Sequence, residues 1–140
     1  MCTVRKAKRN DAKVLFPMAK ELATSFEVDE DSFLNSFDEM IKNDSMIILV
    51  AEDNNIPIGY VMGLTHHAFY ANGLVGWVEE LFVKEEFRKG GCGKSLMDSF
   101  ETIAQERGSK LVSLSTRRAA SFYESIGYEE SATYFKKTFD

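Results

Sequence analysis

Residues 88–95 read Arg-Lys-Gly-Gly-Cys-Gly-Lys-Ser (RKGGCGKS), and this short stretch decides the fold. Its last letters match a nucleotide-binding P-loop, whose full pattern is G-x-x-x-x-G-K-[ST]. The first glycine of that pattern would fall on position 88, where the chain has Arg88. A P-loop protein also needs a later apolar strand that ends in an aspartate for magnesium, whereas residues 110–116 (KLVSLST) end in Thr116. The sequence therefore disfavours an ATP- or GTP-hydrolysing core.

The same stretch keeps the physical features of an anion-binding loop. An apolar strand precedes it, three glycines leave backbone N–H groups uncovered, and a helix begins behind it. Glycine lets the main chain approach an oxyanion closely, and Arg88 can bind a phosphate through two parallel hydrogen bonds. The alternative is a tight strand-to-helix connection whose glycines serve packing alone.

Upstream of this loop, the sequence predicts a strand, two helices and a meander of strands. Residues 2–8 alternate weakly, and apolar residues at helical spacing predict helices over about 10–26 and 29–41. The period then changes to that of strands over residues 46–52, 56–70 and 74–83, with Asn72-Gly73 as a hairpin turn. Three consecutive strands with short connections predict an antiparallel meander.

Downstream, the sequence predicts alternating helices and strands. The helix behind the glycines ends near Gly108, a short apolar strand covers 110–115, and a helix covers about 116–126. Residues 128–139 (YEESATYFKKTF) are expected to supply one or two closing strands. This order predicts a mixed α/β (α+β) fold around one sheet, with residues 1–140 as a single domain.

Composition excludes several function classes. The formal net charge is −5 over 140 residues, so no nucleic-acid or anionic-membrane partner is expected. The two cysteines, Cys2 and Cys92, form no C-x-x-C motif, and neither a disulfide framework nor a structural metal site is expected. His66 and His67 have no further ligands nearby in sequence. The absence of a signal peptide and of a long apolar run predicts a cytoplasmic protein.

Two motifs together give the chain a family resemblance. Residues 81–83 (LFV), a four-residue turn and residues 88–93 (RKGGCG) match the pattern of a strand followed by [RQ]-x-x-G-x-[GA]. Further on, residues 116–128 (TRRAASFYESIGY) match N-x-x-A-x-x-[FL]-Y-x-x-x-G-[FY], except that Thr116 replaces the asparagine. In this spacing the chain resembles the GNAT superfamily of acyl-CoA-dependent N-acetyltransferases over nearly its whole length. The family more often has glycine directly after the arginine, where this chain has Lys89.

The resemblance implies a particular fold and cofactor site. The GNAT-like fold has a central, mostly antiparallel sheet of six to seven strands, with a V-shaped splay between strands 4 and 5, flanked by about four helices. Acetyl-CoA would lie in the splay, and coenzyme A would leave as product. The pyrophosphate would be bound beside Arg88 by the amides of Lys89, Gly90, Gly91, Cys92, Gly93 and Lys94. The pantetheine arm would pair with the backbone of Leu81, Phe82 and Val83, and Thr116 occupies the place of the usual cofactor-contacting asparagine.

The resemblance also implies catalytic residues for transfer to an amine. A lysine-like amine has a pKa of about 10.4, so a base must take its proton. Glu79 is the first candidate, from its offset to Val83 in polyamine-type relatives, and Glu80 is the second. Strand alternation would point these two carboxylates to opposite faces unless a bulge intervenes. Tyr123 would donate the proton to the departing thiolate, and the backbone N–H of Leu81 or Phe82 would polarise the thioester carbonyl.

The expected activity is transfer of an acetyl group from acetyl-CoA to a primary amine of a small molecule or peptide, by direct attack in a ternary complex. The alternative is a non-catalytic GNAT-like module that binds acyl-CoA as a sensor. The sequence leaves open the acceptor, the oligomeric state (including a homodimer), and which glutamate is the base. Acidic residues 29–31 could attract a cationic amine, although a solvated helix start also explains them.

Overall fold

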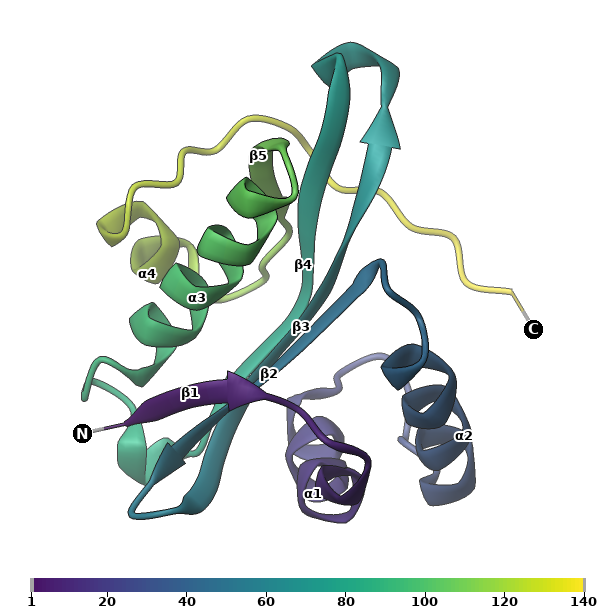
Figure 1. The fold of residues 1–140 in the computed structure, drawn as a ribbon, viewed down its shortest axis with the longest axis vertical. Coiled ribbons are helices and arrows are strands. Elements are labelled where there is room, and N and C mark those ends of the chain that lie inside the picture. Colours follow the sequence, from purple (N-terminus) through teal and green to yellow (C-terminus); the bar gives the residue numbers. More distant parts are fainter. Residues whose placement is uncertain (1, 140) are drawn as a thin grey trace.

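The computed structural model describes residues 2–139 and has one five-stranded sheet in the order β1-β2-β3-β4-β5 (Figure 1). The strands are β1 (Thr3–Lys6), β2 (Met46–Asp53), β3 (Ile56–Ala68), β4 (Gly73–Val83) and β5 (Ser109–Leu114). The first four strands pair antiparallel, while β5 runs parallel to β4. The predicted meander over β2, β3 and β4 is therefore confirmed.

Helices cover both faces of this sheet (Figure 1). They are α1 (Ala12–Leu22), α2 (Glu30–Ile41), α3 (Cys92–Glu106) and α4 (Ala120–Ser125). Short 3-10 turns lie before α1 (Arg9–Asp11), between β3 and β4 (Phe69–Ala71) and between β4 and α3 (Glu85–Phe87). Because side chains alternate along a strand, neighbouring residues of β2 enter different cores. Ile47 and Leu49 pack with α3 on one face, whereas Ile48 and Val50 pack with α1 and α2 on the other.

The helix limits follow from local capping. Asp29 precedes α2, and its carboxylate accepts a hydrogen bond from the Ser32 amide at 2.9 Å, which satisfies one free N–H of the first turn. Gly91 precedes α3 with φ of 87°, a conformation that glycine adopts without steric cost. The first helix ends at Leu22 rather than near Phe26, and Pro17 lies within it.

A bulge interrupts the pairing of β3 and β4 and turns out to be important for the site. Met62 pairs with Glu80, but the next residue, Gly63, pairs with Val78, so Glu79 is the extra residue. A Cβ atom on Gly63 would overlap the Trp77 carbonyl oxygen and lie 2.7 Å from the Phe100 ring. Glycine at this position therefore lets α3 pack directly against the bulge.

The expected strand count was wrong, because the sheet has five strands rather than six to seven. Residues 128–139 form no strand in the described structure and cross to the α1 side of the molecule (Figure 1). There, Lys136 Nζ donates to Ser25 Oγ at 2.6 Å. An alternating pattern shows that a segment can form a strand, but it does not say which sheet edge the segment reaches.

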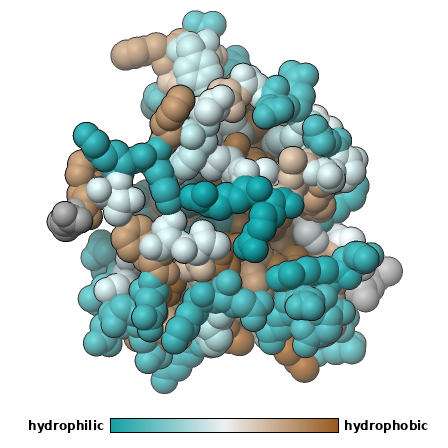
Figure 2. Space-filling model, turned by 180° about the vertical axis from the view of Figure 1, so that it is seen from behind, coloured by the Kyte–Doolittle hydropathy of each residue, from teal (hydrophilic) through white to brown (hydrophobic). Residues whose placement is uncertain are grey.

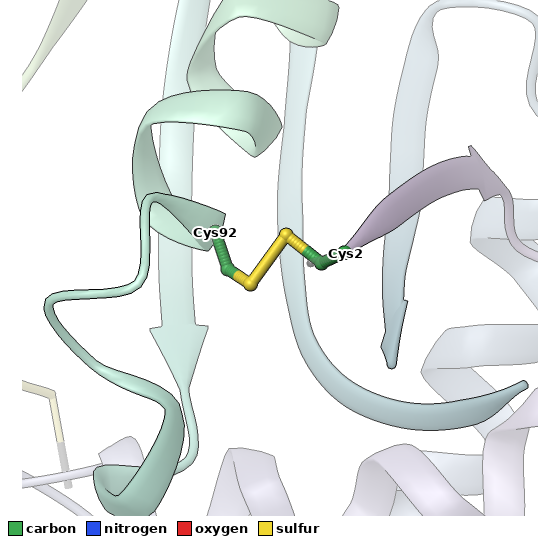
Figure 3. The surroundings of a disulfide bond; sticks show 2 residues. All are labelled: Cys2 and Cys92. Atoms are coloured by element: carbon green, nitrogen blue, oxygen red, sulfur yellow. A yellow bond between two sulfur atoms is a disulfide. The ribbon is translucent and has the colours of Figure 1, made fainter. Parts of the chain in front are cut away.

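The expectation of no disulfide was also wrong, because Cys2 and Cys92 are bonded (Figure 3). Their Cα atoms lie 5.9 Å apart although 90 positions separate them in sequence. Cys2 directly precedes β1, and Cys92 is the first residue of α3, so the bond ties the start of the chain to the glycine loop. Sequence spacing could not reveal this pair, since the sheet brings the two residues together.

Candidate active site

The sheet opens between β4 and β5. Their pairing ends at Val78 and Leu114, so the last five residues of β4 have no partner on that side. A cleft of about 1090 Å³ runs from this opening to the α1–α2 segment, and residues of β2, β3, β4, α4 and the C-terminal segment also line it. Figure 2 shows the face behind the sheet, hollowed above the helical layer and with apolar residues on its floor.

The bulge directs both candidate carboxylates into this cleft. Glu79 and Glu80 both line it, whereas strict alternation would have separated them. Glu79 is exposed and accepts a hydrogen bond from Trp77 Nε1. Glu80 is half-buried and lies on the face where Phe82 packs with α1 and α2. The same bulge therefore gives two neighbouring carboxylates different environments.

Glu80 has a buried partner that the sequence did not reveal. Tyr60 of β3, with 4% of its surface exposed, donates its hydroxyl to Glu80 Oε1 at 2.6 Å. Burial raises the pKa of Glu80, the Tyr60 hydrogen bond opposes that rise, and the nearby Glu79 charge adds to it. Burial and the Glu80 carboxylate both raise the pKa of Tyr60, so its hydroxyl stays a donor. Only the β3–β4 register, which sequence reading does not give, brings the two together.

Tyr123 lies on α4 and also lines the cleft. It is 9% exposed, and its ring makes edge contacts with Phe122 and Tyr128. Burial raises the pKa of the phenol, so it is protonated at neutral pH. The predicted catalytic residues Glu79, Glu80 and Tyr123 thus line one cleft.

The glycine loop has the conformation expected of a helix start with free amides. The first helical bond of α3 runs from Ser95 N–H to the Gly91 carbonyl at 3.0 Å, which leaves the amides of residues 92–94 without helical acceptors. No side chain caps this end of α3. Lys89 has φ of 73°, a left-handed conformation that favours glycine and that explains the family's more usual residue at this position.

Two other predicted cofactor residues make contacts within the protein. Arg88 donates Nε–H to the Val83 carbonyl at 2.7 Å, and its guanidinium lies 5.4 Å from the centre of the Phe82 ring. Thr116 Oγ1 accepts the Ala119 amide at 3.1 Å, so it stabilises the turn into α4. Gly93 has a packing role as well, because a Cβ there would lie 3.2 Å from the Phe122 ring.

The backbone groups of β4 that face the opening can be identified from the pairing of β4 with β3. Lys84 N–H donates to the Ile58 carbonyl on β3, so alternation turns the amides of Leu81 and Val83 away from β3. These groups face the opening to β5. One acceptor on this edge, the Val83 carbonyl, is already occupied by Arg88.

Comparison with known proteins places the chain in a family. The model of the acetyltransferase (GNAT) domain matches residues 44–130, and the chain belongs to this family of acyltransferases. It is 27% identical over 140 residues to the uncharacterized N-acetyltransferase YhfO of Bacillus subtilis (strain 168), covering 94% of this chain and 92% of the relative. The early resemblance is thereby confirmed.

Solved structures show the same fold. Glucosamine-6-phosphate N-acetyltransferase from Arabidopsis thaliana has a TM-score of 0.86 at 23% identity, covering 100% of this chain and 99% of that one. The aminoglycoside N-acetyltransferase AAC(6')-Iy in complex with CoA has a TM-score of 0.84 at 20% identity, covering 98% and 95%. Within residues 2–139, no helix is long and apolar enough to cross a membrane, and no cluster of His, Cys, Asp or Glu could hold a metal ion.

Proposed function

We propose that the protein transfers an acetyl group from acetyl-CoA to a primary amine by direct attack in the cleft between α2, β4 and α4. The observation that carries this proposal is the hydrogen-bonded pair of Tyr60 and Glu80, which lines the same cleft as the protonated phenol of Tyr123. Amine acetylation requires a base for the amine and an acid for the leaving thiolate, and both kinds of group line this cleft. Family membership supports acyl transfer in general.

The glycine loop fits the diphosphate of acetyl-CoA, and the open strand edge fits its amide-containing arm. The uncapped start of α3 offers amides of residues 92–94 to a diphosphate, and the partial positive charge of the helix end favours it. The edge of Leu81 and Val83 offers main-chain groups to an amide-containing arm. Arg88 would add its terminal NH₂ groups to the diphosphate while its Nε holds Val83.

Glu80, rather than Glu79, is the base that the geometry supports best. A general base works best when its pKa lies near the working pH, and burial moves the pKa of Glu80 upward. The amine nitrogen would attack the thioester carbonyl carbon while Glu80 accepts the amine proton, and the N–H of Leu81 would stabilise the charge on the carbonyl oxygen. The C–S bond would then break, and Tyr123 would give its proton to the leaving thiolate. Leu81 is preferred to Phe82 because the Phe82 amide points to β3.

The proposal is tested by following free thiol with acetyl-CoA and a panel of amines. Glu80→Gln and Tyr123→Phe are each expected to lower kcat by about 100-fold while leaving the affinity for CoA nearly unchanged. Glu79→Gln is the matched control, with an expected loss of less than about fivefold because that carboxylate is exposed. Tight CoA binding without thiol release from any amine would instead support the acyl-CoA sensor.

A further inference from the structure

We propose that the acceptor is a primary amine carried on a flat apolar body, such as an arylalkylamine. This inference rests on the proposed acetyl transfer and assigns the chemistry of the part of the cleft that lies beyond the catalytic pair. The supporting observations are the apolar lining, the sign of the charges, and two exposed aromatic rings at the mouth.

The acceptor part of the cleft is lined largely by apolar and aromatic side chains. The apolar lining residues of α1, α2, β3 and β4 include Leu22, Phe33, Phe37, Met40, Met62 and Trp77. Ser32 and Ser36 of α2 line the cleft beside them. Phe33 stacks on Phe37 with ring centres 5.9 Å apart, so the wall presents aromatic surface over two turns of α2. A lining of this kind is suited to a ligand that buries carbon surface.

Two aromatic rings at the mouth are exposed and line the same cleft. Phe26, in the α1–α2 segment, is 68% exposed, and Tyr134, in the C-terminal segment, is 59% exposed. The hydrogen bond from Lys136 to Ser25 holds these two segments together. Aromatic surface that is exposed to water in the free protein, at the rim of a cleft, is expected where a bound apolar ligand would cover it.

The charges select a cation and disfavour an anion. Four carboxylates line the cleft, those of Glu27, Asp29, Glu79 and Glu80. The basic side chains among the lining residues are Arg117 and Arg118, which lie in the turn between β5 and α4, on the cofactor side. An ammonium group is therefore attracted toward Glu80, whereas a phosphate on the acceptor would meet negative charges. Lys136 lies beside the α1–α2 segment, where its Nζ donates to Ser25 Oγ.

Polar acceptors fit this lining less well than an aromatic one. A sugar amine would bring several hydroxyl groups into the cleft, where Thr24, Ser32 and Ser36 offer partners but the aromatic side chains do not. The hydroxyl groups that meet carbon surface would lose their hydrogen bonds to water without a partner. A linear polyamine satisfies the carboxylates but covers neither Phe26 nor Tyr134. An aromatic ring linked to a primary amine by a short chain satisfies both the charges and the apolar wall.

The test compares phenethylamine, spermidine, kanamycin and glucosamine 6-phosphate as acceptors with acetyl-CoA. Phenethylamine is expected to have a kcat/KM at least about tenfold above each of the others. Phe26→Ala is expected to raise the KM for phenethylamine by about fivefold at unchanged kcat, and to leave the KM for spermidine within about twofold. Phe69→Ala is the matched control, because Phe69 is fully exposed at the β3–β4 turn and outside the cleft lining.

Failure of this inference is distinguishable from failure of the proposed function. If spermidine, kanamycin or the phosphorylated sugar is the best acceptor, acetyl transfer stands and the apolar acceptor is excluded. If no amine releases thiol, acetyl transfer to amines fails, and calorimetric binding of the four amines still decides the acceptor chemistry. Phenethylamine binding that Phe26→Ala weakens and Phe69→Ala does not would support the inference, whereas equal or absent binding would overturn it.

Discussion

At the scale of single residues, the pairing of Tyr60 with Glu80 makes a pH prediction. The base must be ionised, so activity falls as the pH drops through the pKa of Glu80. Tyr60→Phe removes the hydrogen bond that lowers this pKa, and the pKa of Glu80 rises further. The acid limb of kcat/KM is expected to move to higher pH by about one unit, with activity near wild type on the alkaline side.

The control variant for this prediction, Glu79→Gln, should shift the acid limb of kcat/KM in the opposite direction. The negative charge of Glu79 raises the pKa of Glu80, so Glu79→Gln should move the acid limb to lower pH, by a smaller amount because Glu79 is exposed. The other ionisable groups that line the cleft are Glu27, Asp29, Arg117, Arg118, Tyr123 and Tyr134, and both variants keep them. Shifts of the same sign in the two variants would contradict the assignment of Glu80.

The backbone of Lys89 gives a second prediction at this scale. A lysine in the left-handed region carries a steric cost that glycine lacks, and Lys89 has φ of 73°. Lys89→Gly is expected to raise the free energy of unfolding by about 0.5–1 kcal/mol, measured by urea unfolding. Lys89→Ala keeps the cost and removes only the charge, so it should not stabilise; equal gains in both variants would show that the charge, not the backbone, is responsible.

Sequence reading worked best where the chemistry is local. The motif of residues 88–93 and the pattern around Tyr123 located the loop and a cleft residue, because both depend on fixed spacing along the chain. Tyr60 was missed because its partner lies 20 residues away and is brought near only by the strand register. Sequence reading put Glu79 ahead of Glu80 as the base, whereas the proposal from the structure puts Glu80 first. The bulge that sets their different exposure is not visible in the letters VEEL.

At the scale of elements, the bulge of β4 depends on the close approach of α3. A methyl group at position 63 would collide with the Trp77 backbone and the buried Phe100 ring, neither of which can move without disturbing the core. Gly63→Ala is therefore expected to lower the free energy of unfolding by about 2–3 kcal/mol in chemical denaturation.

Gly90→Ala, in the loop between β4 and α3, is the control for Gly63→Ala. A methyl group there would lie no closer than 3.4 Å to the Phe87 carbonyl oxygen, so Gly90→Ala should change the free energy of unfolding by less than about 0.5 kcal/mol. Backbone entropy favours alanine over glycine at both positions, so a similar loss for both variants would mean that the contact of α3 with the bulge does not explain the effect at Gly63.

The C-terminal segment marks the limit of element prediction. Residues 128–139 were expected to supply one or two further strands, but the segment forms none in the described structure and carries Tyr134 into the lining of the cleft. Strand propensity depends strongly on which neighbours are available, and propensity alone cannot say whether a sheet edge is reached. The meander was predicted correctly because its strands are joined by short turns, which leave few alternative pairings.

At the scale of the whole molecule, the bond between Cys2 and Cys92 closes most of the sheet into one covalent loop (Figure 3). The bond ties the residue before β1 to the helix start that carries the proposed diphosphate amides. Closing a loop of this length restricts the unfolded chain, and such a bond typically adds about 2–4 kcal/mol to the free energy of unfolding.

The final prediction concerns the redox dependence of stability. Cys2→Ser is expected to lower the free energy of unfolding by about 2–4 kcal/mol relative to the oxidised wild type, measured by urea unfolding without reductant. Excess dithiothreitol should bring the wild type to the level of the variant and leave the variant unchanged, because only the wild type has a bond to reduce. Ser95→Ala, on the same helix, keeps both cysteines and should respond to reductant as the wild type does. If the wild type has equal stability with and without reductant while mass analysis shows the thiols changing state, the bond does not restrain the unfolded chain, and the link between β1 and α3 rests on packing alone.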